Sequence, residues 1–254
     1  MTPRALLHLI QRAGVFSEGV SLSGWRSRLP WIRATFRPDR PEIPPTPVSL
    51  IILCCRRDLD QAIGLVNSFA ERFDETILMI DAEKPDQQVL DLLQVDCRVY
   101  ARSLQGDFSA QRNAAVEKAR SCWVLHLDAD ETPSEALLAE LPYWIHLARR
   151  HRLRVIGVPR QNWVDGELSE VYPDYQFRLH RADQKWVRKV HEVPEACEKR
   201  WRQVWRIPAQ SDAVILHHLT RAGMGEKARF YDTIQQGMGQ TEGIRSILDR
   251  KESQ

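Results

Sequence analysis

The chain has 254 residues, of which 43% are hydrophobic and 28% charged, as expected for a globular protein with one large α/β domain or two small ones. Its five cysteines form no C-x-x-C pair and are odd in number, which argues against a zinc site and a disulfide framework. No apolar stretch approaches the length of a membrane span, and the first residues lack the order of a secretion signal, so we expect a cytoplasmic protein.

The N-terminal region is basic. Residues 1–40 hold seven arginines against two acidic residues, and residues 25–40 interleave arginines with Trp25, Trp31 and Phe36. This mixture favours an anionic membrane surface, whereas no recognisable nucleic-acid module accompanies it. A solvated leader is the alternative interpretation. The proline-rich stretch 41–47 predicts a hinge that separates this arm, residues 1–47, from the main domain.

The main domain is predicted over residues 48–224, with a helical tail at 225–254. Apolar runs predict strands at 48–55, 76–80, 97–100 and 122–127, and the stretches between and after them predict helices at 59–73, 87–93, 109–119 and 134–150. This alternation predicts an α/β, Rossmann-like, mainly parallel sheet flanked by helices. Two further strands, at 154–158 and 175–180, are expected in a less regular second half.

Asp128-Ala129-Asp130 follows the fourth predicted strand. Side chains two apart in an extended chain point to one side, so both carboxylates can face one divalent cation. The carboxyl ends of parallel strands are also where open α/β sheets bind ligands. The alternative is a pair of acids that merely precede a helix. In that interpretation Thr132-Pro133-Ser134-Glu135 is a capping box with Pro133 as the first helical residue.

Several polar blocks occur in a recognisable order. They are Asp81, the helix start 106–115 with Gln-Arg-Asn, the Asp-Ala-Asp-Glu block at 128–131, the segment 172–179, the Val-His-Glu block at 190–192, and His217. Together they resemble glycosyltransferase family 2, especially its lipopolysaccharide inner-core glucosyltransferases. The resemblance covers roughly residues 48–231.

The resemblance implies a GT-A fold, a nucleotide-sugar donor with UDP-glucose as first choice, inversion at the anomeric carbon, and Mg²⁺ or Mn²⁺. It assigns the metal to Asp128, Asp130 and His217. The candidate donor-binding residues are Asp58, Asp81, Gln111, Arg112, Asn113 and Asp128. Arg112 lies in the first turn of a helix, where free N–H groups favour anions. Arg112 and Asn113 can equally brace the loop. In the family that the chain resembles, the loop after the first strand contacts the nucleotide. This sequence lacks the usual residues of that loop, and Asp58 can replace the missing contact.

Inverting transfer needs a base for the acceptor hydroxyl, and Glu192 and Asp174 are the two candidates. His191 is next to Glu192 and can tune its proton affinity. The implied acceptor is a glycan or glycolipid of the bacterial envelope, similar to a lipopolysaccharide core, reached from the cytoplasmic face of the inner membrane. A sugar-phosphate nucleotidyltransferase and a catalytically silent membrane-associated binding protein of the same fold are the alternative functions.

Overall fold

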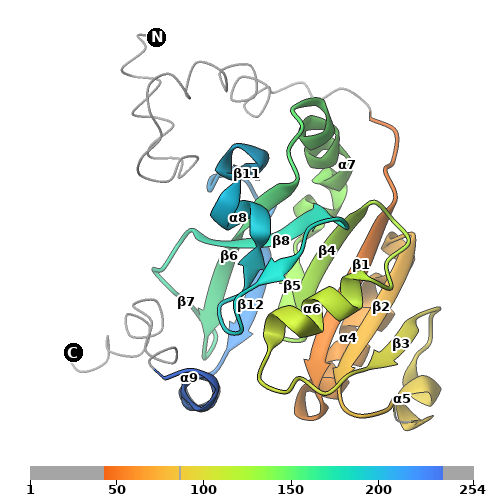
Figure 1. The fold of residues 1–254 in the computed structure, drawn as a ribbon, viewed down its shortest axis with the longest axis vertical. Helices are drawn as coiled ribbons and strands as arrows, with labels where there is room; N and C mark the ends of the chain where they lie inside the picture. Colours follow the sequence, from red (N-terminus) through yellow and green to blue (C-terminus); the bar gives the residue numbers. More distant parts are fainter. Residues whose placement is uncertain (1–42, 86, 237–254) are drawn as a thin grey trace.

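The computed structural model describes residues 43–85 and 87–236 (Figure 1). Four strands form a parallel half-sheet in the order β3-β2-β1-β4: β1 (Val48–Cys55), β2 (Glu75–Asp81), β3 (Arg98–Ala101) and β4 (Trp123–Asp128). β1 and most of β2 are buried, which explains their continuous apolar sequences. All four strands point their carboxyl ends at one edge of the sheet.

Helices cover both faces of this half-sheet (Figure 1). They are α4 (Leu59–Phe69), α5 (Gln87–Leu92), α6 (Phe108–Val116) and α7 (Glu135–Arg150), with short 3₁₀ turns η1 (Arg56–Asp58) and η2 (Ala70–Arg72). α4 and α7 pack into the larger core cluster, whereas α6 packs with the side chains of the opposite face. The carboxylate of Asp107 caps α6 by accepting from the Ala110 amide at 2.8 Å.

The second half continues the same sheet with mixed strand directions. The order continues β4-β8-β6-β12-β5, with β5 (Glu131–Pro133), β6 (Val155–Val164), β8 (Asp174–Arg181) and β12 (Ile215–Leu219). β8 runs antiparallel to both β4 and β6, and β12 runs parallel to β6. This reversal joins the two halves through one continuous sheet.

Smaller elements surround this second half. They are β7 (Glu167–Leu168), β9 (Trp186–Val187), β10 (Val193–Pro194), α8 (Glu195–Lys199), η3 (Trp201–Gln203), β11 (Val204–Arg206) and α9 (Arg221–Ile234). The hydroxyl of Thr220 caps α9 by accepting from the Gly223 amide at 3.1 Å. α9 lies beside the sheet edge near β12 (Figure 1).

The predicted α/β class, with a mainly parallel first half and a less regular second half, is confirmed. The capping box at 132–135 is wrong: Pro133 ends β5, and Ser134 caps α7 by accepting from the Leu137 amide. The pairing of β5 with β12 holds Pro133 in extended backbone. The helical tail begins at Arg221, because Thr220 supplies the cap. Cys122, which begins the predicted strand 122–127, is exposed, and β4 begins one residue later at Trp123.

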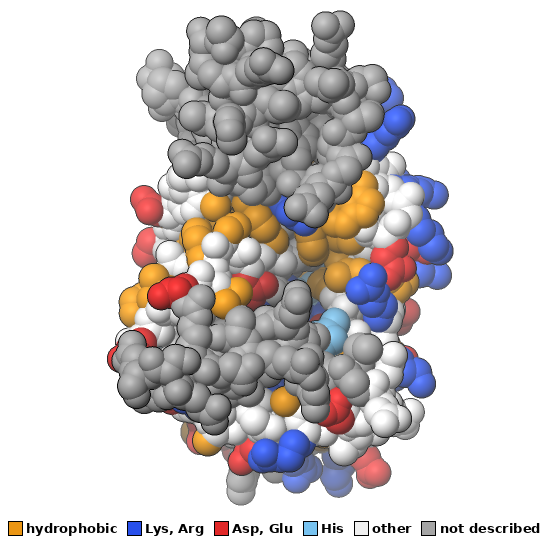
Figure 2. Space-filling model, turned by 90° about the vertical axis from the view of Figure 1, so that its left-hand side faces the viewer, with side chains coloured by type: hydrophobic (Ala, Val, Ile, Leu, Met, Phe, Trp, Pro, Cys, Tyr) orange, Lys and Arg blue, Asp and Glu red, His pale blue; other side chains and the backbone are white. Residues whose placement is uncertain are grey.

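Within the described residues, no helix is long and apolar enough to span a membrane. The predicted arm falls almost wholly on residues 1–42, which lie outside the described residues. Figure 2 shows hydrophobic side chains gathered across the middle of one face, with Lys and Arg to one side. The large hydrophobic side chains that are exposed include Leu168, Tyr172 and Trp201 from the second half of the fold.

Candidate functional site

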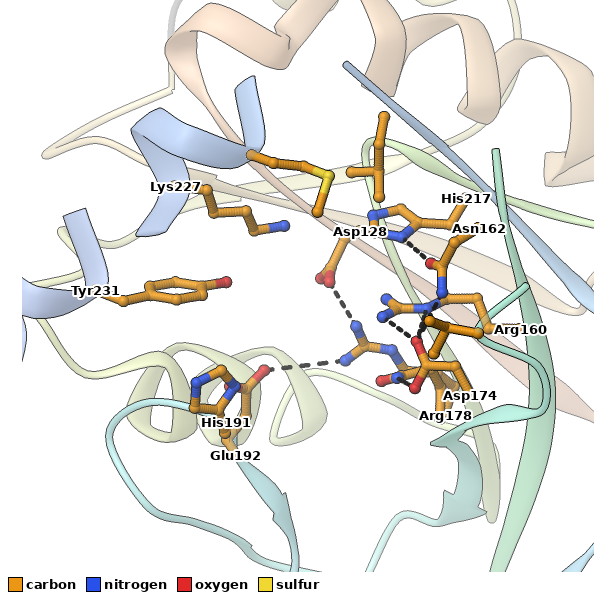
Figure 3. Close-up of a pocket in the computed structure, with 14 residues that line it drawn as sticks. Asp128, Arg160, Asn162, Asp174, Arg178, His191, Glu192, His217, Lys227 and Tyr231 are labelled. Carbon is orange, nitrogen blue, oxygen red and sulfur yellow. Dashed lines mark hydrogen bonds and ion pairs between the residues drawn. The ribbon is translucent and has the colours of Figure 1, made fainter. Parts of the chain in front are cut away.

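A pocket of about 290 Å³ opens where β4 ends and the second half begins (Figure 3). Its walls carry side chains from β6, β8, β12 and α9 and from the loop that contains His191 and Glu192. Most of these residues are polar or charged. The fold therefore brings together residues that are far apart in the sequence, at the sheet edge where α/β proteins bind ligands.

Arg112 joins two acids of this pocket. Its Nε donates to Glu192 Oε1 at 2.6 Å, and its Nη2 donates to Asp128 Oδ1 at 2.9 Å. Its guanidinium carbon lies 4.8 Å from the centre of the Trp186 ring. Only 2% of Arg112 is exposed, so its charge depends on these partners. The planar guanidinium of arginine presents its donors in a fixed geometry, which suits it to hold two acids in defined positions.

The second oxygen of Asp128 accepts from Arg178. Arg178 Nη2 lies 2.5 Å from Asp128 Oδ2 and also donates to Glu131 Oε1 at 3.2 Å. Burial raises the pKa of Asp128, but Arg112 and Arg178 outweigh it and hold the pKa far below its usual value. Asp128 is thus an ionised carboxylate whose two oxygens are both occupied by guanidinium groups.

Asp130 faces His217 instead. His217 Nε2 lies 3.3 Å from Asp130 Oδ2, and His217 Nδ1 lies 2.8 Å from Asn162 Oδ1. Asn162 Nδ2 donates to Asp174 Oδ2 at 3.1 Å, which orients the amide oxygen toward His217. Nδ1 of His217 therefore carries the proton, and Nε2 presents a lone pair.

This arrangement fits a divalent cation at Asp130 and His217. Nε2 of His217 is buried without a hydrogen-bond partner among the described residues, and it faces a carboxylate oxygen. A histidine that donates through its other ring nitrogen is the usual form of a metal ligand. No group of three or more His, Cys, Asp or Glu side chains within the described residues is arranged around one cation. Waters and substrate oxygens would complete the shell, as is common for Mg²⁺.

The two candidate bases differ in how their oxygens are used. Asp174 Oδ2 accepts from Arg160 Nη2 at 2.6 Å and from Asn162, and its Oδ1 accepts from Gln176 Nε2 at 2.9 Å. Burial raises the pKa of Asp174, but Arg160 and these hydrogen bonds lower it overall. Glu192 accepts its hydrogen bond through Oε1, whereas its Oε2 accepts none from a described residue. Glu192 is therefore the more available proton acceptor.

Gln111 and Asn113 brace the surrounding loops. Gln111 exchanges hydrogen bonds with Arg102: its Nε2 donates to the Arg102 carbonyl and its Oε1 accepts from Arg102 Nη1, both at 3.0 Å. Both amide atoms of Asn113 bond the backbone of Trp186, at 2.8 and 3.0 Å. The α6 helix is tied to the loop 186–192 at further points, because the Ser109 hydroxyl donates to the Arg188 carbonyl and the Phe108 amide donates to the Lys189 carbonyl.

Of the six predicted donor-binding residues, all of them described by the structure, Asp128 alone lines this pocket; the other five do not, and Asp58 and Asp81 also make no contact with its acids. Asp81 ends β2, and its Oδ1 accepts from the Leu104 amide at 2.8 Å. Asp58 lies in η1, where its Oδ2 accepts from the Cys55 thiol at 2.8 Å. Asp81 is the last residue of β2 and Asp58 follows β1, so both lie at the edge of the sheet toward which β4 also points. His191, in contrast, lines the pocket. Its backbone lies in the left-handed region, with a φ of 52°.

Sequence reasoning missed several residues of the pocket. They are Arg160, Asn162, Gln176, Lys227 and Tyr231. Arg160 and Asn162 are two apart on β6, so strict alternation along a longer strand would have placed both on one face. The predicted strand ended at Val158 instead. Lys227 and Tyr231 are four apart on a polar helix, a spacing that shows a shared face but not what that face covers.

No protein-family model and no curated protein matches the chain. Solved structures with a similar arrangement include S. aureus TarS 1-349 in complex with UDP, with a TM-score of 0.46 and 16% identity over 81% of this chain and 70% of that chain. TarS 1-349 in complex with UDP-GlcNAc gives 0.45 and 15% over 81% and 71%. A longer TarS structure gives 0.45 and 13%, and this chain spans 43% of it. The mixed sheet itself is consistent with a GT-A-like fold, but likenesses this distant assign no activity.

Proposed function

We propose that this protein is an inverting glycosyltransferase that moves a sugar from a nucleotide-sugar donor to a glycan or glycolipid of the bacterial envelope, similar to a lipopolysaccharide core. The observation that carries the proposal is the bridge made by Arg112, which joins Asp128 at the end of β4 to Glu192 in the second half. This bridge brings two acids into one pocket: Asp128, which ends β4, and Glu192, whose Oε2 accepts no hydrogen bond from a described residue. The blocks that contain these residues are those that resemble glycosyltransferase family 2.

The donor side of the proposal rests on the carboxyl edge of the parallel strands. Asp130 and His217 would hold Mg²⁺ or Mn²⁺ there, and the metal would neutralise the charge on the donor diphosphate when bound. Asp128 would keep Arg112 and Arg178 in place rather than ligate the metal directly, because both its oxygens accept from them. UDP-glucose is the first donor to test.

The acceptor side of the proposal rests on Glu192. Its Oε2 would take the proton from the acceptor hydroxyl while that oxygen forms a bond to the anomeric carbon. The bond from that carbon to the diphosphate oxygen breaks, and its electron pair leaves with the nucleotide diphosphate. Attack opposite to the leaving group inverts the anomeric centre. Asp174 would orient Arg160 and Asn162, since both its oxygens accept from side chains of β6 and β8.

A donor screen with purified protein tests the proposed function. Nucleotide sugars, beginning with UDP-glucose, are added with Mn²⁺ or with EDTA, and we measure both binding by calorimetry and release of nucleoside diphosphate. We expect binding of one donor and its slow hydrolysis, both dependent on metal. Release of pyrophosphate from a nucleoside triphosphate and a sugar phosphate would instead support a nucleotidyltransferase. Donor binding without any turnover, even with envelope glycans, would support the silent binding protein.

We also propose peripheral attachment to the cytoplasmic face of the inner membrane through residues 1–40. The charge of this arm and the aromatic residues Trp25, Trp31 and Phe36 support attachment. A glycolipid acceptor would then lie in the same membrane surface to which the enzyme is attached.

A further inference from the structure

The helix α9 contacts two elements near the carboxyl edge of the sheet. In its first half, Glu226 Oε2 lies 3.8 Å from Arg57 Nη1 in η1. Near its end, the Tyr231 ring contacts both Phe108 at the start of α6, with ring centres 5.7 Å apart, and His191, with centres 5.4 Å apart. The helix therefore contacts both η1, which follows β1, and the start of α6, near the strand ends where the donor diphosphate would bind.

Lys227 and Tyr231 project from α9 into the pocket (Figure 3). Lys227 Nζ lies 3.6 Å from Asp130 Oδ2, which is too long for a good hydrogen bond, and this is its one ion pair with a described residue. The ordinary pKa of a lysine is about 10.4, so its side chain is protonated at neutral pH. Lys227 is therefore a charged ammonium with hydrogen-bond donors to spare.

The three arginines in and behind the pocket are each paired with two carboxylates, although Arg112 Nη1 and Arg178 Nε have no hydrogen-bond partner among the described residues. Arg112 hydrogen-bonds Asp128 and Glu192, Arg178 hydrogen-bonds Asp128 and Glu131, and Arg160 hydrogen-bonds Glu131 and Asp174. Each of these guanidinium groups thus balances two carboxylates and cannot move to an incoming anion without breaking such a pair. Lys227 can turn toward an anion by giving up one long contact.

We propose that Lys227 is a diphosphate-binding residue, which contacts the phosphates of the donor from α9, on the side away from the strands. The inference rests on the proposed function and adds a group that the family-like motifs do not contain. Three ammonium donors on a flexible stem suit phosphate oxygens as a point charge. When the sugar leaves, the electron pair of the broken bond stays on the diphosphate, and Lys227 stabilises that charge. The Tyr231 hydroxyl points into the same space and can donate a further hydrogen bond (Figure 3).

Lys227→Met is the decisive variant, and Arg229→Met is its matched control. Arg229 is an exposed residue of the same helix that does not line the pocket, so the control removes an equal charge without touching the site. We measure binding of pyrophosphate, UDP, GDP, ADP and uridine by calorimetry in the presence of Mg²⁺. Lys227→Met should weaken pyrophosphate and the diphosphate that binds best by about tenfold or more, the scale of one charge-assisted hydrogen bond. Arg229→Met should change them less than about twofold by the same scale.

The outcomes separate this inference from the proposed function. Equal diphosphate binding by Lys227→Met and the parent protein overturns the role of Lys227 and leaves the proposed function intact. A wild-type protein that binds neither pyrophosphate nor any of the three nucleoside diphosphates overturns both. Lys227→Arg retains the charge and should recover most of the affinity. Thermal melting of each variant identifies any loss of fold, and a Lys227→Arg protein as weak as Lys227→Met would also count against a charge-based role.

Discussion

Asn162 determines which ring nitrogen of His217 is protonated. Its amide nitrogen donates to Asp174, so its oxygen accepts from His217 Nδ1 at 2.8 Å. The lone pair on Nε2 then faces Asp130 at 3.3 Å. Asp174, one of the two candidate bases, therefore orients the Asn162 amide, and this amide leaves His217 Nε2 available for the proposed metal.

His217→Ala should abolish tight binding of Mn²⁺ if His217 and Asp130 hold the metal. Asn162→Ala should weaken Mn²⁺ binding by about 10- to 100-fold, the usual effect of removing the partner that orients a metal-bound histidine. The exposed neighbour His218 is the matched control, and His218→Ala should bind Mn²⁺ like the wild type. Electron paramagnetic resonance of Mn²⁺ measures each affinity. Full turnover in EDTA would refute metal dependence.

Glu192→Gln should lower kcat by about 100-fold or more, because general-base catalysis contributes on that scale, while donor affinity is kept. Asp174→Asn should have a smaller effect on kcat, since the oxygens of Asp174 already accept from Arg160, Asn162 and Gln176. Steady-state kinetics with a soluble acceptor separates kcat from KM. An active Glu192→Gln protein beside an inactive Asp174→Asn protein would assign the base to Asp174.

Arg112→Met should lower the free energy of unfolding by about 3–5 kcal/mol, the cost of leaving buried ionised partners without their counter-charge. Both Asp128 and Glu192 lose a hydrogen bond in this variant. Urea unfolding followed by circular dichroism provides the measurement. The triple variant that adds Asp128→Asn and Glu192→Gln should recover part of the loss. Equal stability of Arg112→Met and the wild type would show that the bridge is not a structural element.

Stability should fall as the pH is lowered from 7 to 4. Burial lowers the pKa of His180 to about 4, whereas the pKa of an unfolded histidine is about 6.5. Between these values the unfolded chain binds a proton that the folded chain excludes, so the contribution is complete above pH 6.5 and lost toward pH 4. His180 accounts for about 3 kcal/mol of this change. In His180→Gln, the free energy of unfolding, measured in urea, should depend less steeply on pH in this window. An unchanged slope would contradict the assignment.

Deletion of residues 1–40 should release the protein from anionic liposomes and leave activity on a soluble acceptor analogue unchanged. Each basic residue near an anionic surface contributes about 1 kcal/mol, and salt screens this attraction. Flotation with anionic and with neutral vesicles, at low and high salt, measures the effect. Binding that survives the deletion, or that is equally strong on neutral vesicles in high salt, would exclude an electrostatic anchor.

The first half of the fold was predictable because its strands are continuous apolar runs. The continuous apolar sequence of β1 is typical of a strand buried on both faces of a parallel sheet, and β1 is almost wholly buried. The second half was harder, since β6 alternates toward its end and carries Arg160 and Asn162 into the site. The motif residues Asp128, Arg112 and Glu192 do meet. Their pairing with one another could not be predicted, because it depends on how the loop 186–192 packs against α6.

The contacts between α6 and the loop 186–192 have a mechanical consequence. Asn113 holds the backbone of Trp186 with both amide atoms, the neighbouring Arg112 holds Glu192, and Ser109 holds the Arg188 carbonyl. Because of these contacts, we expect the start of α6 and the loop 186–192 to move together as one rigid unit. A ligand that displaced the start of α6 would therefore be expected to displace Glu192 with it, which would couple the two halves of the proposed site.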